Sequence, residues 1–204
     1  MNASILRQAF AAISRIMDEN RIYLIELDQQ NGDGDLGISM SVGYRAAVEA
    51  LDNANETDLG KLLVKAGFAL NEAAPSTLGT ITTIAIMGMA KELMGKEEVS
   101  FATFSKVLMV GVNNIMTKTG SKPGEKTIID ALFPAVEAMQ KNTDNPKTAL
   151  QAAYKAAAEG SESTRNMLPV HGRAAYYGEK GLGILDGGSV VGKLIFEALY
   201  NCFF

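Results

Sequence analysis

The sequence has 204 residues, of which 47% are hydrophobic, and a formal net charge of -4 with a pI near 5.1. This length and composition suit one globular domain with a sizeable core, which we expect to span residues 1–204. No run rich in Lys and Arg is present, which argues against nucleic-acid binding. No apolar stretch approaches the roughly 18 residues of a membrane span, and the single Cys202 suits a reducing compartment, so we expect a cytoplasmic protein.

The first twenty residues have the pattern of an amphipathic helix rather than of a signal peptide. Apolar residues recur at spacings of three and four from Ile5 to Ile16, and Asn2 or Ser4 can cap the start of this helix. Residues 22–27 could form a short strand, but no second β-branched run follows to pair with it. A helical turn is therefore the simpler prediction for residues 22–27.

The segment that follows is the most unusual in the chain. LDQQNGDGDLGISM, residues 27–40, places Asp28, Asp33 and Asp35 within eight residues and among three glycines. Three like charges this close repel one another unless water or a cation screens them. We therefore interpret the segment as a metal-binding loop, with a solvated Gly/Asp turn as the alternative.

Two better-known motifs fit this loop poorly. Gly32, Gly34 and Gly37 spell G-x-G-x-x-G, but a dinucleotide site needs a βαβ unit, and the two carboxylates among these glycines would repel a bare pyrophosphate. An EF-hand loop that starts at Asn31 has Leu36 where glycine is required. A carboxylate cluster for a hard cation remains. Mg2+ fits best, because it takes few protein carboxylates and completes its shell with water and phosphate oxygens.

The rest of the chain alternates helical patterns with short polar or glycine-rich segments. Thr57 or Asp58 can cap one helix, and Pro75 and Ser76 can start another. That second helix, residues 77–93, is apolar on nearly every side, so we expect it at the centre of the core. The first helix of the chain should end near residue 20. The remaining helices are predicted to cover residues 40–51, 58–71, 100–116, 127–139, 148–166 and 189–200.

These elements predict an all-α fold, because seven or eight helices are accompanied by no convincing strand. We expect a single-domain bundle of about eight helices, without an internal repeat or a linker. The unusual residues fall in four segments between the predicted helices: 28–37, 75–80, 119–127 and 172–188. Helix N-termini carry unpaired N–H groups and a partial positive charge, so several at one end of a bundle would form a phosphate site.

GSKPGEKT, residues 120–127, has the residue types of a P-loop but the wrong spacing. It can be a helix stop followed by a cap at Thr127, or it can bring backbone amides and Lys126 towards phosphate. Both readings remain open from the sequence.

Three polar residues lie in the last of the four segments or directly before it. Arg173 can hold phosphate bidentately or be an ordinary surface residue. The single His171 has no Ser or Cys motif that would make it part of a triad, so we expect it at the surface. Asp186 can cap the last helix.

Taken in order, the four segments resemble a known family. LDxxxGDGDxG, STLGT, GSKPGEKTIIDALFP and GRAAYYGEKGLGxxDGG are similar to the motifs of the DhaL family, the nucleotide-binding subunits of phosphotransferase-system-dependent dihydroxyacetone kinase. The resemblance covers essentially the whole chain. It implies a barrel of antiparallel helices that holds ADP or ATP and two Mg2+ ions at one end.

The resemblance also implies a function with partners. The bound nucleotide would receive a phosphoryl group from a DhaM-like phosphohistidine protein and pass it to dihydroxyacetone, or a related small ketose or polyol, on a DhaK-like subunit. Two alternatives stay open: a non-catalytic regulatory paralogue that binds a partner such as a transcription regulator, and a single-chain ATP-dependent kinase. The last fits less well because 204 residues leave no room for a ketone-binding domain. The sequence does not decide whether the protein forms a homodimer.

Carried across motif by motif, the resemblance implies that Asp28, Asp33 and Asp35 bind Mg2+ and form the catalytic centre with Arg173. The residues that it implies for the nucleotide are Leu36, Gly37, Ser39, Ser76, Thr77, Gly79, Thr80, Gly120, Thr127, Arg173, Asp186, Gly187 and Gly188.

The chain departs from the family pattern at three places. Leu36 stands where the family has His in GDxDHG, and Thr77-Leu78-Gly79 stands where it has G-x-S-G. Residues 184–188 read ILDGG where the family has H-x-D-P-G. These departures leave the three carboxylates intact and predict a more apolar pocket wall.

Overall fold

The computed structural model describes residues 1–204 and contains nine α-helices. Their bounds are α1 (Ala3–Glu19), α2 (Arg21–Asp28), α3 (Leu36–Asp52), α4 (Leu59–Ala73), α5 (Thr77–Leu93), α6 (Phe101–Thr119), α7 (Ile129–Gln140), α8 (Pro146–Ser163) and α9 (Gly187–Phe203). Two 3-10 segments, η1 (Thr164–Asn166) and η2 (Arg173–Gly181), lie between α8 and α9. The only β pairing is an isolated bridge between Asn2 and Glu98, so the all-α prediction is confirmed.

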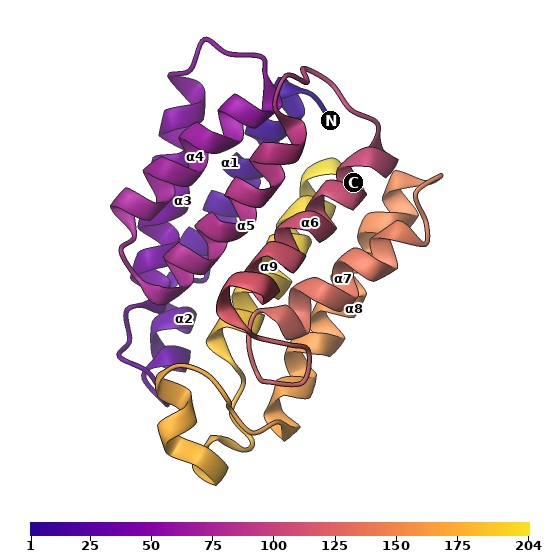
Figure 1. The fold of residues 1–204 in the computed structure, drawn as a ribbon. Helices are drawn as coiled ribbons and strands as arrows, with labels where there is room; N and C mark the ends of the chain where they lie inside the picture. The colour runs from indigo at the N-terminus through magenta and orange to yellow at the C-terminus, as the bar shows by residue number, and fades with distance from the viewer.

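Eight of the helices form a closed ring. From α3 onwards each helix packs against the next one in the chain as far as α9, and α1 closes the ring by packing against both α9 and α3. The short α2 lies beside α3 at one end of the ring. Neighbouring helices run in opposite directions (Figure 1), as expected for an antiparallel barrel.

Most helix starts are set by a side chain that accepts an N–H group from the first turn, which satisfies one of the unpaired donors there. The sequence offered Asn2 or Ser4 as the cap of the first helix and Thr57 or Asp58 as the cap of a later one. In the structure Asn2 caps α1 and Asp58 caps α4. The other capping side chains belong to Ser76, Ser100, Asn145 and Asp186.

Several boundaries differ from the predicted ones. α3 begins at Leu36 rather than at residue 40, because the acidic loop leads directly into the helix. α7 begins at Ile129 rather than at Thr127. The Asp130 carboxylate organises this start, because it accepts hydrogen bonds from Thr127 N at 2.7 Å and Gly124 N at 2.5 Å. α8 covers Pro146–Ser163 and ends in η1.

The helix predicted at the centre of the core is not central. α5 lies in the ring between α4 and α6, and its buried residues form a single stripe of Gly79, Thr82, Ile86, Ala90 and Leu93. In a ring, the sides of a helix are covered by its two neighbours while its outer face stays open. The apolar residues of α5 outside the buried stripe, among them Ile81, Ile84, Ala85 and Met89, are accordingly only partly buried.

The two ends of the ring differ (Figure 1). Both chain termini lie at one end, together with the loops at 53–58, 94–100 and 141–145. The opposite end carries the connections at residues 29–35, 74–76, 120–128 and 164–186. The up-and-down order of the helices thus gathers all four unusual segments at one end. No helix is long and apolar enough to cross a membrane.

Candidate functional site

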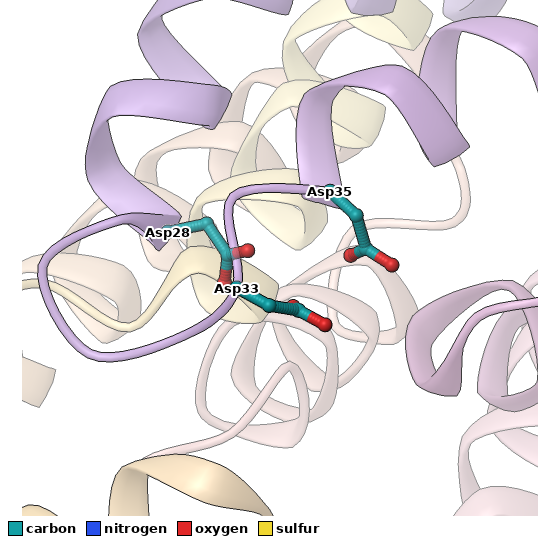
Figure 2. Close-up of side chains that lie close together, drawn as sticks. All are labelled: Asp28, Asp33 and Asp35. Carbon is teal, nitrogen blue, oxygen red and sulfur yellow. The ribbon is translucent and has the colours of Figure 1, made fainter.

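Three carboxylates of the acidic loop (residues 28–35) face the same space. Figure 2 shows Asp28 at the end of α2, Asp33 within the loop and Asp35 just before α3. One carboxylate oxygen from each residue lies within 4.8 Å of the others. The loop folds around Asp28, whose Oδ2 accepts a hydrogen bond from Gly34 N at 2.7 Å. A Cβ at residue 32 would lie 2.3 Å from Asp28 Oδ1, so this tight turn requires Gly32.

The electrostatics of the loop favour a bound cation. Burial raises the pKa of Asp35, and the charges of Asp33 and Asp28 raise it further, while Arg173 partly offsets them. A divalent cation would relieve this repulsion. The donor set consists only of hard carboxylate oxygens, which Mg2+ prefers over nitrogen or sulfur ligands. The three residues therefore fit a Mg2+ site.

Arg173 lies against this loop from the other side. It begins η2, and its Nη1 is 2.7 Å from Asp33 Oδ2. Both side chains are more than one third exposed, so water screens the ion pair and it adds little stability. A guanidinium held this loosely can turn from a carboxylate to a phosphate oxygen without a large energetic loss.

Two helix N-termini point into the same region. Ser76 Oγ accepts from Gly79 N at 3.1 Å at the start of α5, and Asp186 Oδ2 accepts from Ser189 N at 2.6 Å at the start of α9. The first turns leave further N–H groups without an intrahelical partner, and these can bind an anion.

A pocket of about 370 Å³ lies between these elements. The sequence-selected residues that line it are Asp28, Asp33, Asp35, Leu36, Ser76, Thr77, Thr127, Arg173, Asp186, Gly187 and Gly188. Thr80 lies instead in an adjoining groove, which shares Pro75, Ser76, Thr77, Ile81, Ser121 and His171 with the pocket.

Four selected residues lie outside both cavities: Gly37, Ser39, Gly79 and Gly120. The glycines among them have structural roles. A Cβ at residue 37 would lie 2.1 Å from the Arg21 carbonyl oxygen, and one at residue 79 would lie 2.2 Å from that of Ala74. Gly120 ends α6 in the left-handed region, with φ 76°. Proximity in the motif did not bring these residues to the pocket.

The departures from the family pattern have unequal effects on the pocket wall. Leu36 lines the pocket and packs against Gly187, where a Cβ would lie 2.5 Å from Leu36 Cδ2. Leu78 and Ile81 of α5 also line it. Ile184 and Leu185 do not, because they pack against the core. Leu36 and α5 thus form part of the apolar wall, which Ile115, Ile128 and Ile129 extend.

Asp186 has the most perturbed carboxyl group of the pocket. Burial raises its pKa to about 7; the Ser189 N–H and Lys126 lower it, and the charges of Asp130 and Asp28 raise it. Its backbone N–H donates to Thr164 Oγ1 at 3.0 Å.

His171 and Lys126 differ from the sequence-based expectations. His171 is not an isolated surface residue, because it lines both cavities and its Nε2 lies 2.6 Å from Glu125 Oε2. This hydrogen bond lowers the pKa of Glu125. The Lys126 ammonium is buried against backbone carbonyl groups rather than extended towards a phosphate position. No local pattern in the sequence indicated either arrangement.

Comparison with known proteins identifies the family. Residues 30–201 match the family model of the DAK2 domain. The chain is 30% identical to the ADP-binding subunit DhaL of PEP-dependent dihydroxyacetone kinase 2 from Listeria innocua, over 93% of this chain and 89% of the relative. It is also 30% identical to L-erythrulose 1-kinase from Mycolicibacterium smegmatis, over 91% of this chain but only 33% of that protein.

A solved structure has the same fold. The dihydroxyacetone kinase from C. freundii in complex with AMP-PNP and Mg2+ superposes with a TM-score of 0.74 and 25% identity. The match covers 98% of this chain and 33% of that one, so this chain spans about a third of the solved protein. The family model spans most of the sequence and a DhaL subunit matches along nearly its whole length, which shows that this chain belongs to the DAK2 domain family and is related to the DhaL subunits of dihydroxyacetone kinases.

Proposed function

We propose that this protein is a phosphotransferase subunit that carries Mg-ADP or Mg-ATP as a bound cofactor. It receives a phosphoryl group from a DhaM-like phosphohistidine protein and transfers it to dihydroxyacetone, or a related small ketose or polyol, on a DhaK-like subunit. We further propose that residues 1–204 act as one nucleotide-binding domain.

One observation carries this proposal. Asp28, Asp33 and Asp35, the Arg173 guanidinium and the N-termini of α5 and α9 all border one pocket of about 370 Å³. The carboxylates fit a cation, while the guanidinium and the amides fit an anion. A metal–polyphosphate ligand combines these two charges, and neither an anion nor a cation alone would use the whole site.

The residues suit phosphoryl transfer because this reaction depends mainly on positioning and charge neutralisation. Mg2+, when bound, would neutralise phosphate charge and orient phosphate oxygens. Asp28, Asp33 and Asp35 would hold the ion, and the amides of α5 and α9 would hold phosphate oxygens. The Arg173 guanidinium would leave Asp33 and bind the phosphoryl group that is transferred. No protein nucleophile is needed.

Related proteins support the donor and the class of acceptor. The Listeria innocua relative is named as PEP-dependent, which favours a phosphoryl donor charged from PEP over free ATP. The name of the L-erythrulose 1-kinase relative favours a small ketose as acceptor.

The surface around the pocket supports a protein partner. Five large apolar side chains of the connection between α8 and α9 are exposed: Leu168, Val170, Tyr176, Tyr177 and Leu182. Tyr176 is 92% exposed, although burial of an aromatic ring in an interface is a large favourable contribution. The subunit that holds the acceptor would cover these residues as it approaches the site.

The primary test is the nucleotide itself. We expect the purified protein to retain ADP or ATP in a Mg2+-dependent way, detected by mass spectrometry of the small molecules released on denaturation. Asp33→Asn should lower nucleotide and Mg2+ affinity by about tenfold or more, because it removes one ligand charge. Asp52→Asn, an exposed change at the far end of α3, serves as the control. A wild-type protein that binds nucleotide equally well in EDTA would contradict the proposal.

A second experiment separates transfer from regulation. The protein is mixed with candidate DhaK-like and DhaM-like proteins, and labelled phosphate is followed from PEP to dihydroxyacetone and to L-erythrulose. Transfer supports the proposed function. Nucleotide binding without transfer to any acceptor would support the regulatory alternative.

A further inference from the structure

Lys126 is an unusual residue for the interior of this protein. It is 3% exposed and is the only non-glycine residue with a positive φ, 60°. Its Nζ donates to the carbonyl oxygens of Thr164 at 2.7 Å, Gly181 at 2.9 Å and Ile184 at 2.7 Å. These bonds use all three ammonium protons, so no donor is left for a phosphate.

The three carbonyl groups lie at the two ends of one segment, the α8–α9 connection (residues 164–186). Thr164 begins this connection, and Gly181 and Ile184 lie near its end. A single ammonium group therefore bonds to both ends of a long excursion of the chain. Other bonds join the same two ends: Arg165 to the Gly183 carbonyl, the Gly183 N–H to the Arg165 carbonyl, and the Asp186 N–H to Thr164 Oγ1. Just outside the connection, Ser189 Oγ also lies 3.0 Å from Ser161 Oγ and 3.5 Å from Thr164 Oγ1. Lys126 is the only charged group among the buried partners and the only one that contacts three points of the base.

The middle of the connection carries Arg173 and has few contacts of its own with the ring. It is tied to the acidic loop by the exposed Arg173–Asp33 ion pair and to the 120–127 turn by His171–Glu125 and by Val170 N to Glu125 O at 3.4 Å. The Arg173–Asp33 pair is exposed and restrains the segment weakly, whereas the His171–Glu125 bond is partly buried. The position of Arg173 thus depends on the base of the connection together with the contacts of residues 170 and 171.

The same ammonium also sets the start of α9. Asp186 follows Ile184 closely and is joined to Thr164 by its N–H group. Its carboxylate caps α9, and Gly187 and Gly188 line the pocket. Loss of the base would therefore disturb Arg173 and the α9 amides together, while the acidic loop, which is folded around Asp28 by its own Gly34 N–H bond, would keep its geometry.

We infer that Lys126 is a positioning residue that closes the base of the α8–α9 connection and so holds Arg173 and the N-terminus of α9 in place around the pocket. Its effect on the connection is independent of ligand. Its effect on a bound nucleotide rests on the proposed function.

The first test uses amide hydrogen exchange of the nucleotide-free protein. Lys126→Met keeps the apolar stem and removes the three donors, and we expect exchange across residues 165–184 to rise by about tenfold or more, with α1 to α6 unchanged. The matched control is Asp58→Asn at the opposite end of the ring. Asp58 is also a buried charged residue that joins two segments, since it accepts from Lys61 N at 3.0 Å and Gly95 N at 2.8 Å. In the Asp58→Asn variant the increase in amide hydrogen exchange should be confined to the neighbourhood of residues 58–61 and 95.

The second test compares metal with nucleotide. Lys126→Met should keep Mg2+ affinity within about threefold, measured by calorimetry with the metal alone, and release Mg-ADP about tenfold faster. Asp58→Asn should change neither. Lys126→Gln, which keeps two donors on a shorter side chain, should give intermediate values and replaces the Met variant if that protein does not fold.

Two results would overturn the inference. One is unchanged exchange in residues 165–184 in both Lys126 variants. The other is a loss of nucleotide binding with the exchange of the connection unchanged, which would mean that Lys126 acts on the phosphate directly. Failure of the wild-type protein to bind nucleotide would contradict the proposed function but leave the exchange test decisive.

Discussion

Asp186 is a helix cap and a pocket residue at the same time. As a cap its carboxylate accepts the Ser189 N–H at 2.6 Å, which favours the ionised form. Burial and the nearby Asp130 and Asp28 charges oppose ionisation and raise its pKa from 3.8 to about 7. At a pH between these two pKa values, Asp186 therefore keeps its proton in the folded state but has lost it in the unfolded state.

The sign of the resulting pH dependence follows from linkage. Between pH 4 and pH 7 the folded protein holds more protons at Asp186 than the unfolded protein, so this residue lowers the free energy of unfolding as pH rises through that window. A shift of three pKa units corresponds to at most roughly 4 kcal/mol, and water in the pocket reduces this value.

Asp186→Asn should remove this contribution. Asparagine still caps a helix, so we expect the variant to gain stability relative to wild type at pH 8 and to gain little at pH 4. Urea denaturation in EDTA at both pH values measures the difference. An equal effect of the substitution at both values would show that the Asp186 pKa is not raised.

At the scale of elements, close helix packing depends on a few glycines. α7 and α8 approach so closely that a Cβ at Gly160 would lie 2.0 Å from the Asp130 carbonyl oxygen. Asp130 also organises the 120–127 turn through its bonds to Gly124 N and Thr127 N. The spacing of this helix pair is thereby coupled to the geometry of one side of the pocket.

Gly160→Ala should therefore destabilise the protein despite the better helix propensity of alanine. Backbone cannot move aside as a flexible side chain can, and we expect a loss of roughly 2–4 kcal/mol in urea denaturation. Gly67→Ala in α4 is the matched control. Its Cβ would meet only side-chain atoms, Ile86 Cγ2 at 3.2 Å and Met87 Sδ at 3.3 Å. The control should stay within about 1 kcal/mol of wild type, and equal losses would contradict the packing explanation.

At the scale of the whole molecule, the two ends of the ring differ in what they carry. The chain termini lie at one end (Figure 1). The connections at the other end supply the pocket lining and the exposed apolar side chains near it. A nucleotide in the pocket would thus be reached by other proteins only from the pocket end, past Tyr176 and Tyr177.

Substitution at this end should separate nucleotide binding from transfer. Tyr176→Ser removes an aromatic ring that is 92% exposed, so the fold should not change. We expect the variant to retain ADP as the wild type does. The rate of phosphoryl transfer to the acceptor subunit should fall about tenfold or more, because the apparent affinity for that subunit is lower. Tyr23→Ser is the control, because Tyr23 is an exposed tyrosine of α2 that lies outside the pocket lining. Unchanged transfer by the Tyr176 variant would remove this residue from the proposed interface.

Much of this architecture could be predicted from local patterns. Helical periodicity, capping residues and the short polar connections predicted an all-α bundle, because each of these signals depends on neighbouring residues only. The antiparallel barrel was implied by the resemblance to the DhaL family. The density of Asp and Gly in residues 28–35 likewise indicated a cation site without knowledge of the fold, since like charges cannot be crowded freely. The alternation of up and down helices then placed the four unusual segments at one end.

Other features depend on contacts between distant parts of the chain, and only the tertiary structure decided them. Gly37 and Gly79 belong to the motifs but contact backbone of neighbouring turns, whereas His171 pairs with Glu125 across two segments. α5 lies in the ring rather than at its centre, because its neighbours cover its sides. The sequence left open whether Lys126 reaches a phosphate, and in the structure its partners are carbonyl groups up to 58 positions away in the chain. No local pattern carries that information, because the direction of a side chain is set by what packs around it.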